Sequence, residues 1–397
     1  MTTTLDLTGS IPLVNGIPVY PVFGSTANYG ITHTGDLLVS RLRDGTDLNE
    51  IWEDAVNALA EFNKNRLSIV NLLSYITTNS ADAVYQNLTV PSFEEASEFG
   101  VSKSIAPPAE VLLCGFTRKD YDLRTEFTRF FLREADRRQV DAIINTAMTA
   151  DNQNLTGNVL RRLFSPARTH NEFGHTVYSL LDGLAPGAPD HLGQSFPVST
   201  SHYLTTGNAT LDSLDIETAV DMIQDKGYGS PENGSHIIIF ANPQEAKVIQ
   251  TWRAGKESRT GGPISTWDWI PSRASFPYLT DQQIVGEIAP EDYGGLAVLG
   301  SLGPTWLVSS HFIPKNYLAV VASGGPGSQN NPVGVRIHEL PEHQGLKLIP
   351  GNHQGLPLVE SFYTRCFGTG VRHRSAAVCY FVDAGSTYVA PTNLIPV

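Results

Sequence analysis

Residues 235–249 read SHIIIFANPQEAKVI, and this stretch decides the class of fold. The run at 236–240 is apolar and short, as expected of a strand that is buried on both faces. The motif NPQE at 242–245 combines a helix cap, a proline at the first helical position and an acidic residue that can close a capping box. A strand followed at once by a helix is therefore predicted, with the helix continuing as AKVIQTWRA to Gly255.

A second helix is predicted just before this strand, over residues 213–226. Its apolar side chains recur at helical spacing, and Gly227 follows its end as a C-terminal cap. Beyond Lys256, short β-prone pieces alternate with Gly, Pro and Asn, and the chain ends in two apolar strands separated by the basic turn GTGVRHRS. Helices and strands mixed in this way predict an α+β protein.

Two longer helices are predicted nearer the N-terminus. The first begins at Asp47, where Glu50 stands at capping-box spacing, and its apolar stripe extends to Leu73. The second spans residues 133–164 and stops before Pro166. Its apolar stripe is broken in the middle, which indicates a helix that packs on different partners along its length.

Two segments are too poor in periodic apolar residues to form cores of their own. Residues 1–45 mix β-prone pieces with Gly, Pro and Thr, which favours an extended arm lying on another surface. Residues 83–118 mix short β-prone pieces with Pro, Gly and acidic residues. A long two-stranded excursion fits them best, and such excursions serve a function or a partner.

The composition limits the classes of function. The chain has 397 residues and a net charge of 27 − 40 = −13, which argues against a protein whose main task is to grip nucleic-acid phosphates. No apolar run is long enough for a membrane span, and the first residues do not form a signal peptide, so synthesis inside the cell is expected. The three cysteines, Cys114, Cys366 and Cys379, form no Cys-x-x-Cys pair and are expected to be small buried residues.

Few motifs suggest chemistry. The segment HNEFGH places His170, Glu172 and His175 close together, but a zinc helix needs His-Glu-x-x-His spacing. No nucleophile elbow, phosphate-binding loop or dinucleotide fingerprint is present, so no catalytic residue, cofactor or metal is predicted. The three HNEFGH residues remain an alternative as a metal-dependent hydrolase site.

The charges that stand out are candidates for contacts between subunits. Glu94, Glu95 and Glu98 lie together in the acidic excursion, which also contains Lys103. Basic residues cluster on the long helix and in the turn near the C-terminus. The candidates are Arg133, Arg137 and Arg138 on the helix and Arg372 and Arg374 in the turn. Arg161 and Arg162 form a further basic pair on the helix. In an assembly of identical copies, opposite patches of one chain can become partners. A solvated face with local ion pairs is the competing interpretation.

The order of these parts resembles the major capsid proteins of tailed bacteriophages, which share the Hong Kong 97-type fold. The segments FEEASEFG, SHYLTTGNATLD and ANPQEA, together with Ala150-Asp151, are similar to capsid proteins from phages of actinobacteria. The resemblance implies an N-terminal arm at 1–45, an N-terminal helix region at 46–82 and an E-loop hairpin at 83–118. It also implies a peripheral domain at 119–207 with a spine helix at about 133–164, an axial domain at 208–335, and strands at 336–397 that return to the axial and peripheral parts.

The resemblance implies a structural protein with no enzymatic activity. Copies of the chain would assemble as hexamers and pentamers into an icosahedral shell around double-stranded DNA, without sequence-specific binding. The location would be the virion, with assembly in the bacterial cytoplasm and no role for a membrane. Portal, decoration or scaffolding proteins are further expected partners. Because arm-like sequence follows Met1 directly, scaffolding is expected to be a separate protein or absent. An encapsulin-like nanocompartment is the alternative with the same fold.

Overall fold

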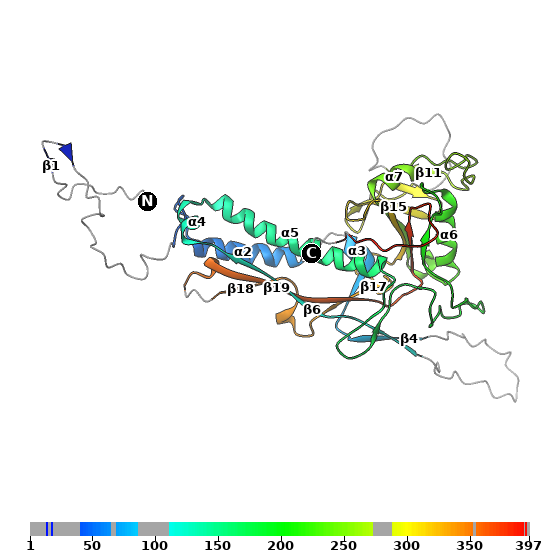
Figure 1. Cartoon of the computed structure of the whole chain (residues 1–397), viewed down its shortest axis with the longest axis horizontal. Coiled ribbons are helices and arrows are strands. Elements are labelled where there is room, and N and C mark those ends of the chain that lie inside the picture. The colour runs from blue at the N-terminus through cyan, green and yellow to red at the C-terminus, as the bar shows by residue number, and fades with distance from the viewer. Residues whose placement is uncertain are drawn as a thin grey trace. The chain divides into compact units, whose positions relative to one another are not determined.

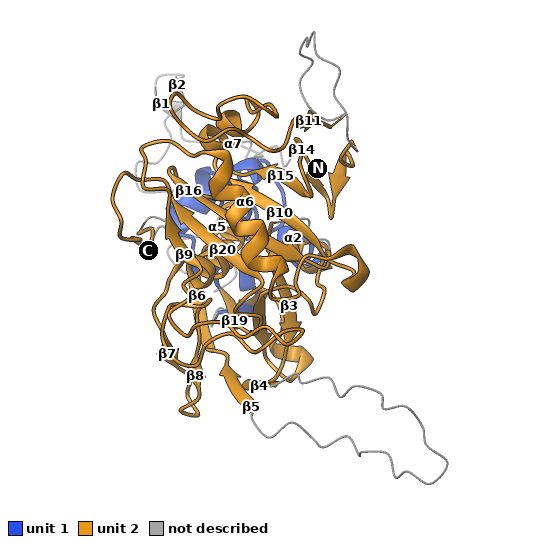
Figure 2. Cartoon of the chain, turned by 90° about the vertical axis from the view of Figure 1, so that its right-hand side faces the viewer, with its two compact units in different colours: residues 1–58, 124–145, 349–362 blue, residues 59–123, 146–348, 363–397 orange. Residues whose placement is uncertain are grey.

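The computed structural model describes residues 13–14, 17–18, 40–64, 69–85, 111–272, 288–351, 355–392 and 394. The chain divides into two compact units, each built from three separate stretches (Figure 2). Unit 1 comprises Met1–Ala58, Arg124–Asn145 and Ile349–Phe362, and unit 2 comprises Leu59–Leu123, Thr146–Leu348 and Tyr363–Val397. Helices and strands are mixed throughout, so the α+β prediction is confirmed.

Helix α2 (Leu48–Lys64) begins where the sequence predicted. The backbone N–H of Asn49 donates to the Asp47 carboxylate at 2.9 Å, which confirms Asp47 as the cap. No hydrogen bond from the Asp47 N–H to Glu50 is found among the described residues, so the expected capping box is not formed; the Glu50 carboxylate lies 3.7 Å from Arg137. The apolar stripe that was expected to continue one helix to Leu73 belongs in part to a separate helix, α3 (Ile69–Leu73).

The helix predicted over 133–164 is two helices. Arg133 lies in α4 (Arg129–Glu134), and α5 (Arg137–Phe164) begins two residues after Ala135, the residue that caps α4 (Figure 1). Asp136 and Gln139 explain the break. The Gln139 N–H donates to the Asp136 carboxylate, and the Asp136 N–H donates to the Gln139 side chain, both at 3.1 Å. This reciprocal capping box starts a new helix and makes the predicted start four residues too early.

Unit 2 contains a seven-stranded mixed sheet. Its order is β11-β14-β15-β10-β16-β20-β9, with β10 parallel to β15 and antiparallel to β16. The strands are β9 (Tyr203–Thr205), β10 (His236–Ala241), β11 (Trp269–Pro271), β14 (Gly300–Leu302), β15 (Thr305–Ser309), β16 (Tyr317–Ser323) and β20 (Ala377–Phe381). The sheet thus also takes β9 from before residue 208 and β20 from after residue 335.

Strand β10 explains why the sheet is buried on both sides. Successive side chains of a strand point to opposite faces. Ile237 and Ile239 pack in one core with α6 (Ser213–Gln224) and α7 (Pro243–Ile249), and Figure 2 shows α6 lying across the sheet. Ile238 and Phe240 pack in a second core with α3 and residues 155–164 of α5. The predicted double burial of this strand is confirmed.

Helix α7 is shorter than predicted. The Asn242 side chain accepts from the N–H of Gln244 at 3.1 Å, so the cap is confirmed. Glu245 does not close the box, because its carboxylate accepts from the N–H of Asn316 at 3.0 Å. The helix ends at Ile249 instead of Gly255, since the chain then tightens into i→i+3 hydrogen bonds such as that from the Trp252 N–H to the Ile249 carbonyl.

A second sheet and several hairpins complete the described fold. In the second sheet, β17 (Val333–Ile337) pairs antiparallel with β19 (Glu360–Val371) and parallel with β3 (Ser74–Thr77), and β6 (Lys119–Glu126) and β18 (Lys347–Pro350) also pair with β19. The hairpins are β1 (Leu13–Val14) with β2 (Ile17–Pro18), β4 (Ala81–Tyr85) with β5 (Val111–Gly115), β7 (Thr169–His170) with β8 (Thr176–Val177), and β12 (Asp292–Tyr293) with β13 (Leu296–Ala297). Short 3₁₀ turns occur at Pro231–Asn233, Pro341–His343 and Pro357–Val359.

Candidate assembly elements

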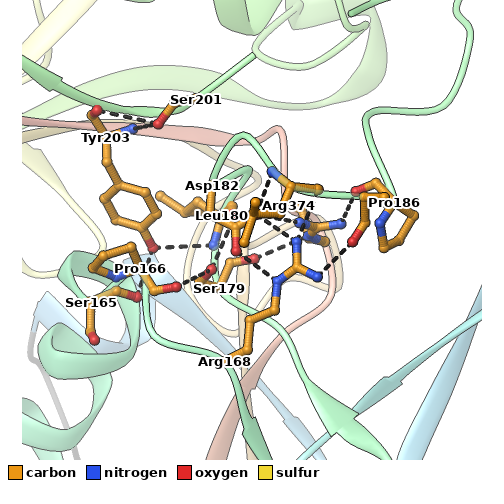
Figure 3. A network of polar contacts seen from close by, with 12 residues as sticks. Ser165, Pro166, Arg168, Ser179, Leu180, Asp182, Pro186, Ser201, Tyr203 and Arg374 are labelled. Atoms are coloured by element: carbon orange, nitrogen blue, oxygen red, sulfur yellow. Dashed lines mark hydrogen bonds and ion pairs between the residues drawn. The ribbon is translucent and has the colours of Figure 1, made fainter. Parts of the chain in front are cut away.

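A buried ionic cluster holds together three segments of unit 2 (Figure 3). Arg168 makes a bidentate contact with the Asp182 carboxylate, with both nitrogen–oxygen distances at 2.6 Å. Arg374 lies 3.4 Å from the same carboxylate, and the side chains of Arg374 and Asp182 are each only 5% exposed. Two cations therefore share one buried anion, and we call Arg168, Asp182 and Arg374 the ionic cluster.

Backbone carbonyls satisfy the remaining donors of the cluster. Arg374 donates to the carbonyl of Ser179 at 3.2 Å and to that of Pro186 at 2.6 Å (Figure 3). Arg168 donates to the carbonyl of Ala185 at 2.6 Å. Burial alone would raise the pKa of Asp182, but the hydrogen bond and charge of Arg168 outweigh it, and the pKa lies below its usual range. The carboxylate is thus held ionised inside the subunit.

The ionic cluster corrects one sequence prediction. Arg374 was predicted to be a contact between subunits, because it belongs to a basic turn and opposite patches of identical copies can become partners. Its guanidinium is instead buried and bonded within its own unit, so it is an internal structural residue. A buried charge of this kind is costly to desolvate unless it is paired and hydrogen-bonded, as it is here.

The hairpin of β4 and β5 is the described part of the predicted excursion. Its strands pair Ala83 with Leu113 and Tyr85 with Val111. Because paired residues point to the same side of a hairpin, these four side chains share one face. Tyr85, Val111 and Leu113 are 49%, 45% and 48% exposed, and we call these three the stem face. A cluster of exposed apolar side chains on an unpaired two-stranded hairpin is typical of a docking surface.

The base of this hairpin is bonded to the turn between β7 and β8, which carries HNEFGH. The Asn171 amide donates to the carbonyl of Ser80 at 2.9 Å, one residue before β4. The Glu172 carboxylate accepts from Arg336 of β17 at 2.6 Å, and Arg336 is only 2% exposed. Figure 2 shows β7 and β8 next to the β4–β5 hairpin. The turn therefore fastens the hairpin to the second sheet.

This geometry does not favour the metal-site alternative. The expected loop is a β-turn, in which His170 pairs with Thr176 across the hairpin. Glu172, which would have to act as ligand or base, is engaged by Arg336. In the part of the chain that the structure describes, no group of three or more His, Cys, Asp or Glu side chains is placed to hold a metal ion.

A further polar network lies at the start of the hairpin. The Tyr75 hydroxyl donates to the Asp82 carboxylate at 3.0 Å, and the amide of Asn79 donates to its other oxygen at 2.9 Å. Arg372 approaches the same carboxylate at 3.9 Å. The side chain of Arg372 is 32% exposed and has an acidic neighbour in its own chain. Its role between subunits stays a prediction.

The three predicted arginines near the start of α5 lie in unit 1. Arg137 contacts the carboxylates of Asp54 at 2.5 Å and Asp141 at 3.5 Å, and hydrogen bonding to Asp54 raises its pKa. Its charge is therefore neutralised within the subunit. Arg133 is paired with the adjacent Glu134 at 2.9 Å. Arg138 is exposed, and no ion pair of it is found in the described part of the chain. Contacts of Arg133, Arg137 and Arg138 with a neighbouring subunit stay predictions.

Four of the predicted contact residues, Glu94, Glu95, Glu98 and Lys103, fall within 86–110 and lie outside the described residues. Most of the predicted arm at 1–45 lies outside them as well.

The chain is similar to a solved chain of Mycobacterium phage Patience. The two are 34% identical, the TM-score is 0.67, and the match covers 92% of this chain and 96% of that chain. The chain belongs to the Hong Kong 97-type family of phage major capsid proteins. It is a structural protein of the virion that forms the icosahedral shell, and it is not an enzyme.

Other solved capsids are more distant from this capsid protein. The capsid of a native GTA particle is 12% identical with a TM-score of 0.44, covering 80% of this chain and 92% of that chain. The mature capsid of bacteriophage PhiM1 is 8% identical with a TM-score of 0.42, covering 80% and 87%. No protein-family model and no curated protein matches the sequence.

Of the two alternatives, a phage capsid and an encapsulin-like nanocompartment, the comparison supports the phage capsid. The chain shares 34% identity with a phage chain over almost its whole length. Among the helices that the structure describes, none has the length and apolarity needed to cross a membrane. The residues that organise this capsid protein include several that sequence reasoning missed, notably Asp182 and Arg336. Their partners lie 14 to 192 residues away along the chain, so no local pattern identifies them.

A buried histidine makes the stability of the capsid subunit dependent on pH. Burial lowers the pKa of His202 to about 3, against the opposing effect of a hydrogen bond to the Ala377 carbonyl at 2.7 Å. The nearby cations Lys226 and Arg374 lower it further. His202 is therefore neutral in the folded subunit but takes up a proton near pH 6.5 when the chain unfolds.

We expect the free energy of unfolding to fall as pH drops from about 6.5 toward 3, by about 1.4 kcal/mol per pH unit for this group. The sign follows because the unfolded chain binds the extra proton. His202→Gln should flatten this dependence in chemical denaturation curves of the unassembled subunit at several pH values. His170→Gln, at an exposed site, is the control and should leave the slope unchanged. Equal slopes for His202→Gln and the unchanged protein would contradict the assignment.

Proposed function

We propose that copies of the chain assemble as pentamers and hexamers into a closed shell that encloses double-stranded DNA. The observation that carries this proposal is the likeness to the Mycobacterium phage Patience chain over 92% of the sequence. A net charge of −13 suits a container wall, because a wall of that sign does not bind the enclosed phosphates tightly.

We further propose which segment of the chain forms each part of the capsid subunit. Residues 1–45 act as the arm and residues 83–118 as the E-loop. Residues 119–207 form the peripheral domain with α5 as its spine. Residues 208–335 form the axial domain, to which β9 and β20 contribute strands.

The stem face is the proposed contact of the E-loop with a neighbouring subunit. Three large apolar side chains are half exposed in a single subunit, and burying the remaining half of each yields about 0.8–1.5 kcal/mol. A contact repeated at every subunit of a shell multiplies this gain. Arg133, Arg138 and Arg372 are proposed as polar contacts of the same assembly.

Charges placed on the stem face should prevent assembly. In the double variant Val111→Lys and Leu113→Lys, we expect folded subunits and a yield of closed particles at least tenfold lower, measured by sedimentation and negative-stain microscopy. Folding should survive because both side chains are exposed in the subunit. Leu192→Lys, at an 88% exposed leucine, is the control and should assemble normally. Normal particle yield from the double variant would refute a role for this face.

Portal, scaffolding and decoration proteins are proposed partners of the shell. Co-purification of such proteins with particles from infected cells tests each of them.

A further inference from the structure

A pocket rich in positive charge lies in unit 2, between β6 and the last turns of α5. Its volume is about 310 Å³. Four basic side chains line it, namely Lys119, Arg161, Arg162 and His170. Thr117, Ser165 and Thr169 line it as well. No Asp or Glu is among the residues that line it. We call it the basic pocket.

The basic pocket lacks counter-charge within the described part of the chain. No ion pair of Lys119, Arg161 or Arg162 is found there, whereas Arg137 of the same helix is surrounded by three carboxylates. Asp120 is not among the residues that line the pocket, because strand alternation places it on the other side of β6 from Lys119. The positive charge of the pocket is therefore open to a ligand.

Arg162 shows most clearly that the pocket lacks an anion. Its only hydrogen bond in the described structure is a long one, 3.4 Å, from a terminal nitrogen to the Thr169 hydroxyl. Its Nε is buried and has no partner among the described residues. Burial lowers the pKa of this guanidinium, and no carboxylate reverses that effect. A guanidinium whose Nε is buried without a partner is costly unless an anion completes its hydrogen bonds.

We propose that the basic pocket receives glutamate carboxylates from a second copy of the chain, supplied by Glu94 and Glu95. The proposal rests on the assembly proposed above and assigns the acidic excursion a specific partner. Segment FEEASE at 93–98 has three carboxylates and no basic residue, so it complements the four basic groups. The pocket is small, which suits single carboxylates entering one at a time and forming charge-assisted hydrogen bonds with Arg161 and Arg162.

The test is a charge exchange. Lys119→Glu with Arg161→Glu reverses two exposed members of the pocket and leaves the half-buried Arg162 in place. Glu94→Lys with Glu95→Lys reverses the proposed ligands. The control is Lys247→Glu with Lys256→Glu, which makes the same charge change at two exposed lysines outside the pocket. Thermal melting of each variant first establishes that the subunit is folded.

We expect each exchange alone to lower the yield of closed particles at least tenfold, the control to assemble normally, and the combination of the two exchanges to recover most of the yield. Normal assembly of the pocket variant would overturn the proposal, and so would a combination that does not recover. Pocket variants that form normal empty shells but lose DNA would also overturn it, since the ligand would then be DNA phosphate. If the unchanged protein forms no shells, the proposed function itself fails, which is a distinguishable result.

Discussion

Replacing Asp182 with alanine should lower the free energy of unfolding of the subunit by about 3–5 kcal/mol. The carboxylate is 5% exposed and is the shared anion of Arg168 and Arg374. Its removal leaves two guanidinium groups facing each other in the interior, and breaking a buried pair by deleting one partner is strongly destabilising. A loss of this size is a large part of the 5–15 kcal/mol that typically holds a domain folded.

Chemical denaturation of unassembled Asp182→Ala subunits measures the effect. Asp190→Ala is the matched control, because Asp190 lies in the same segment but is exposed, and its substitution should change stability by less than about 0.5 kcal/mol. The double variant Asp182→Leu and Arg374→Met should recover part of the loss, since it removes anion and cation together. If Asp182→Ala is as stable as the control, the ionic cluster does not hold the fold together.

Deleting residues 2–40 should abolish closed shells while leaving a folded subunit. The segment has β-prone apolar residues but no periodic pattern with which to bury them by itself, so its proposed place is on neighbouring subunits. The described cores of unit 2 use no residue before Leu59, and their folding should not depend on the arm.

The deletion is best compared with a variant in which residues 2–40 are replaced by a Gly/Ser segment of equal length. Both should melt as the intact subunit does, and both should sediment as small species. Closed shells from the Gly/Ser variant would show that only the length of the arm matters. Closed shells from the deletion variant would show that assembly does not need the arm.

Local patterns predicted the local structure well. The buried strand at 236–240 and the cap at Asn242 are found where hydrophobicity and capping chemistry placed them. The break between α4 and α5 was also present in the sequence, because Asp136 and Gln139 stand at capping-box spacing, but the apolar stripe across it concealed the signal. Glu50 and Glu245 had the right spacing for a box and were drawn instead to Arg137 and Asn316.

Local sequence patterns could not predict the tertiary contacts. Arg374 stands in a turn whose composition favours exposure, yet Asp182, 192 residues away, accounts for its burial. Glu172, the acidic residue of the alternative metal site, is bonded to Arg336, 164 residues away. In both cases the partner is fixed by how the sheets and loops pack, which no spacing within a segment encodes. The family resemblance predicted the architecture, and the likeness to the phage chain confirmed it.

The central claim, a shell built from copies of this chain, is tested most directly by electron microscopy of the purified full-length protein. We expect closed particles of megadalton mass in which clusters of five and six subunits repeat with icosahedral symmetry. A monodisperse monomer or small oligomer, under conditions where the subunit is folded and concentrated, would contradict it.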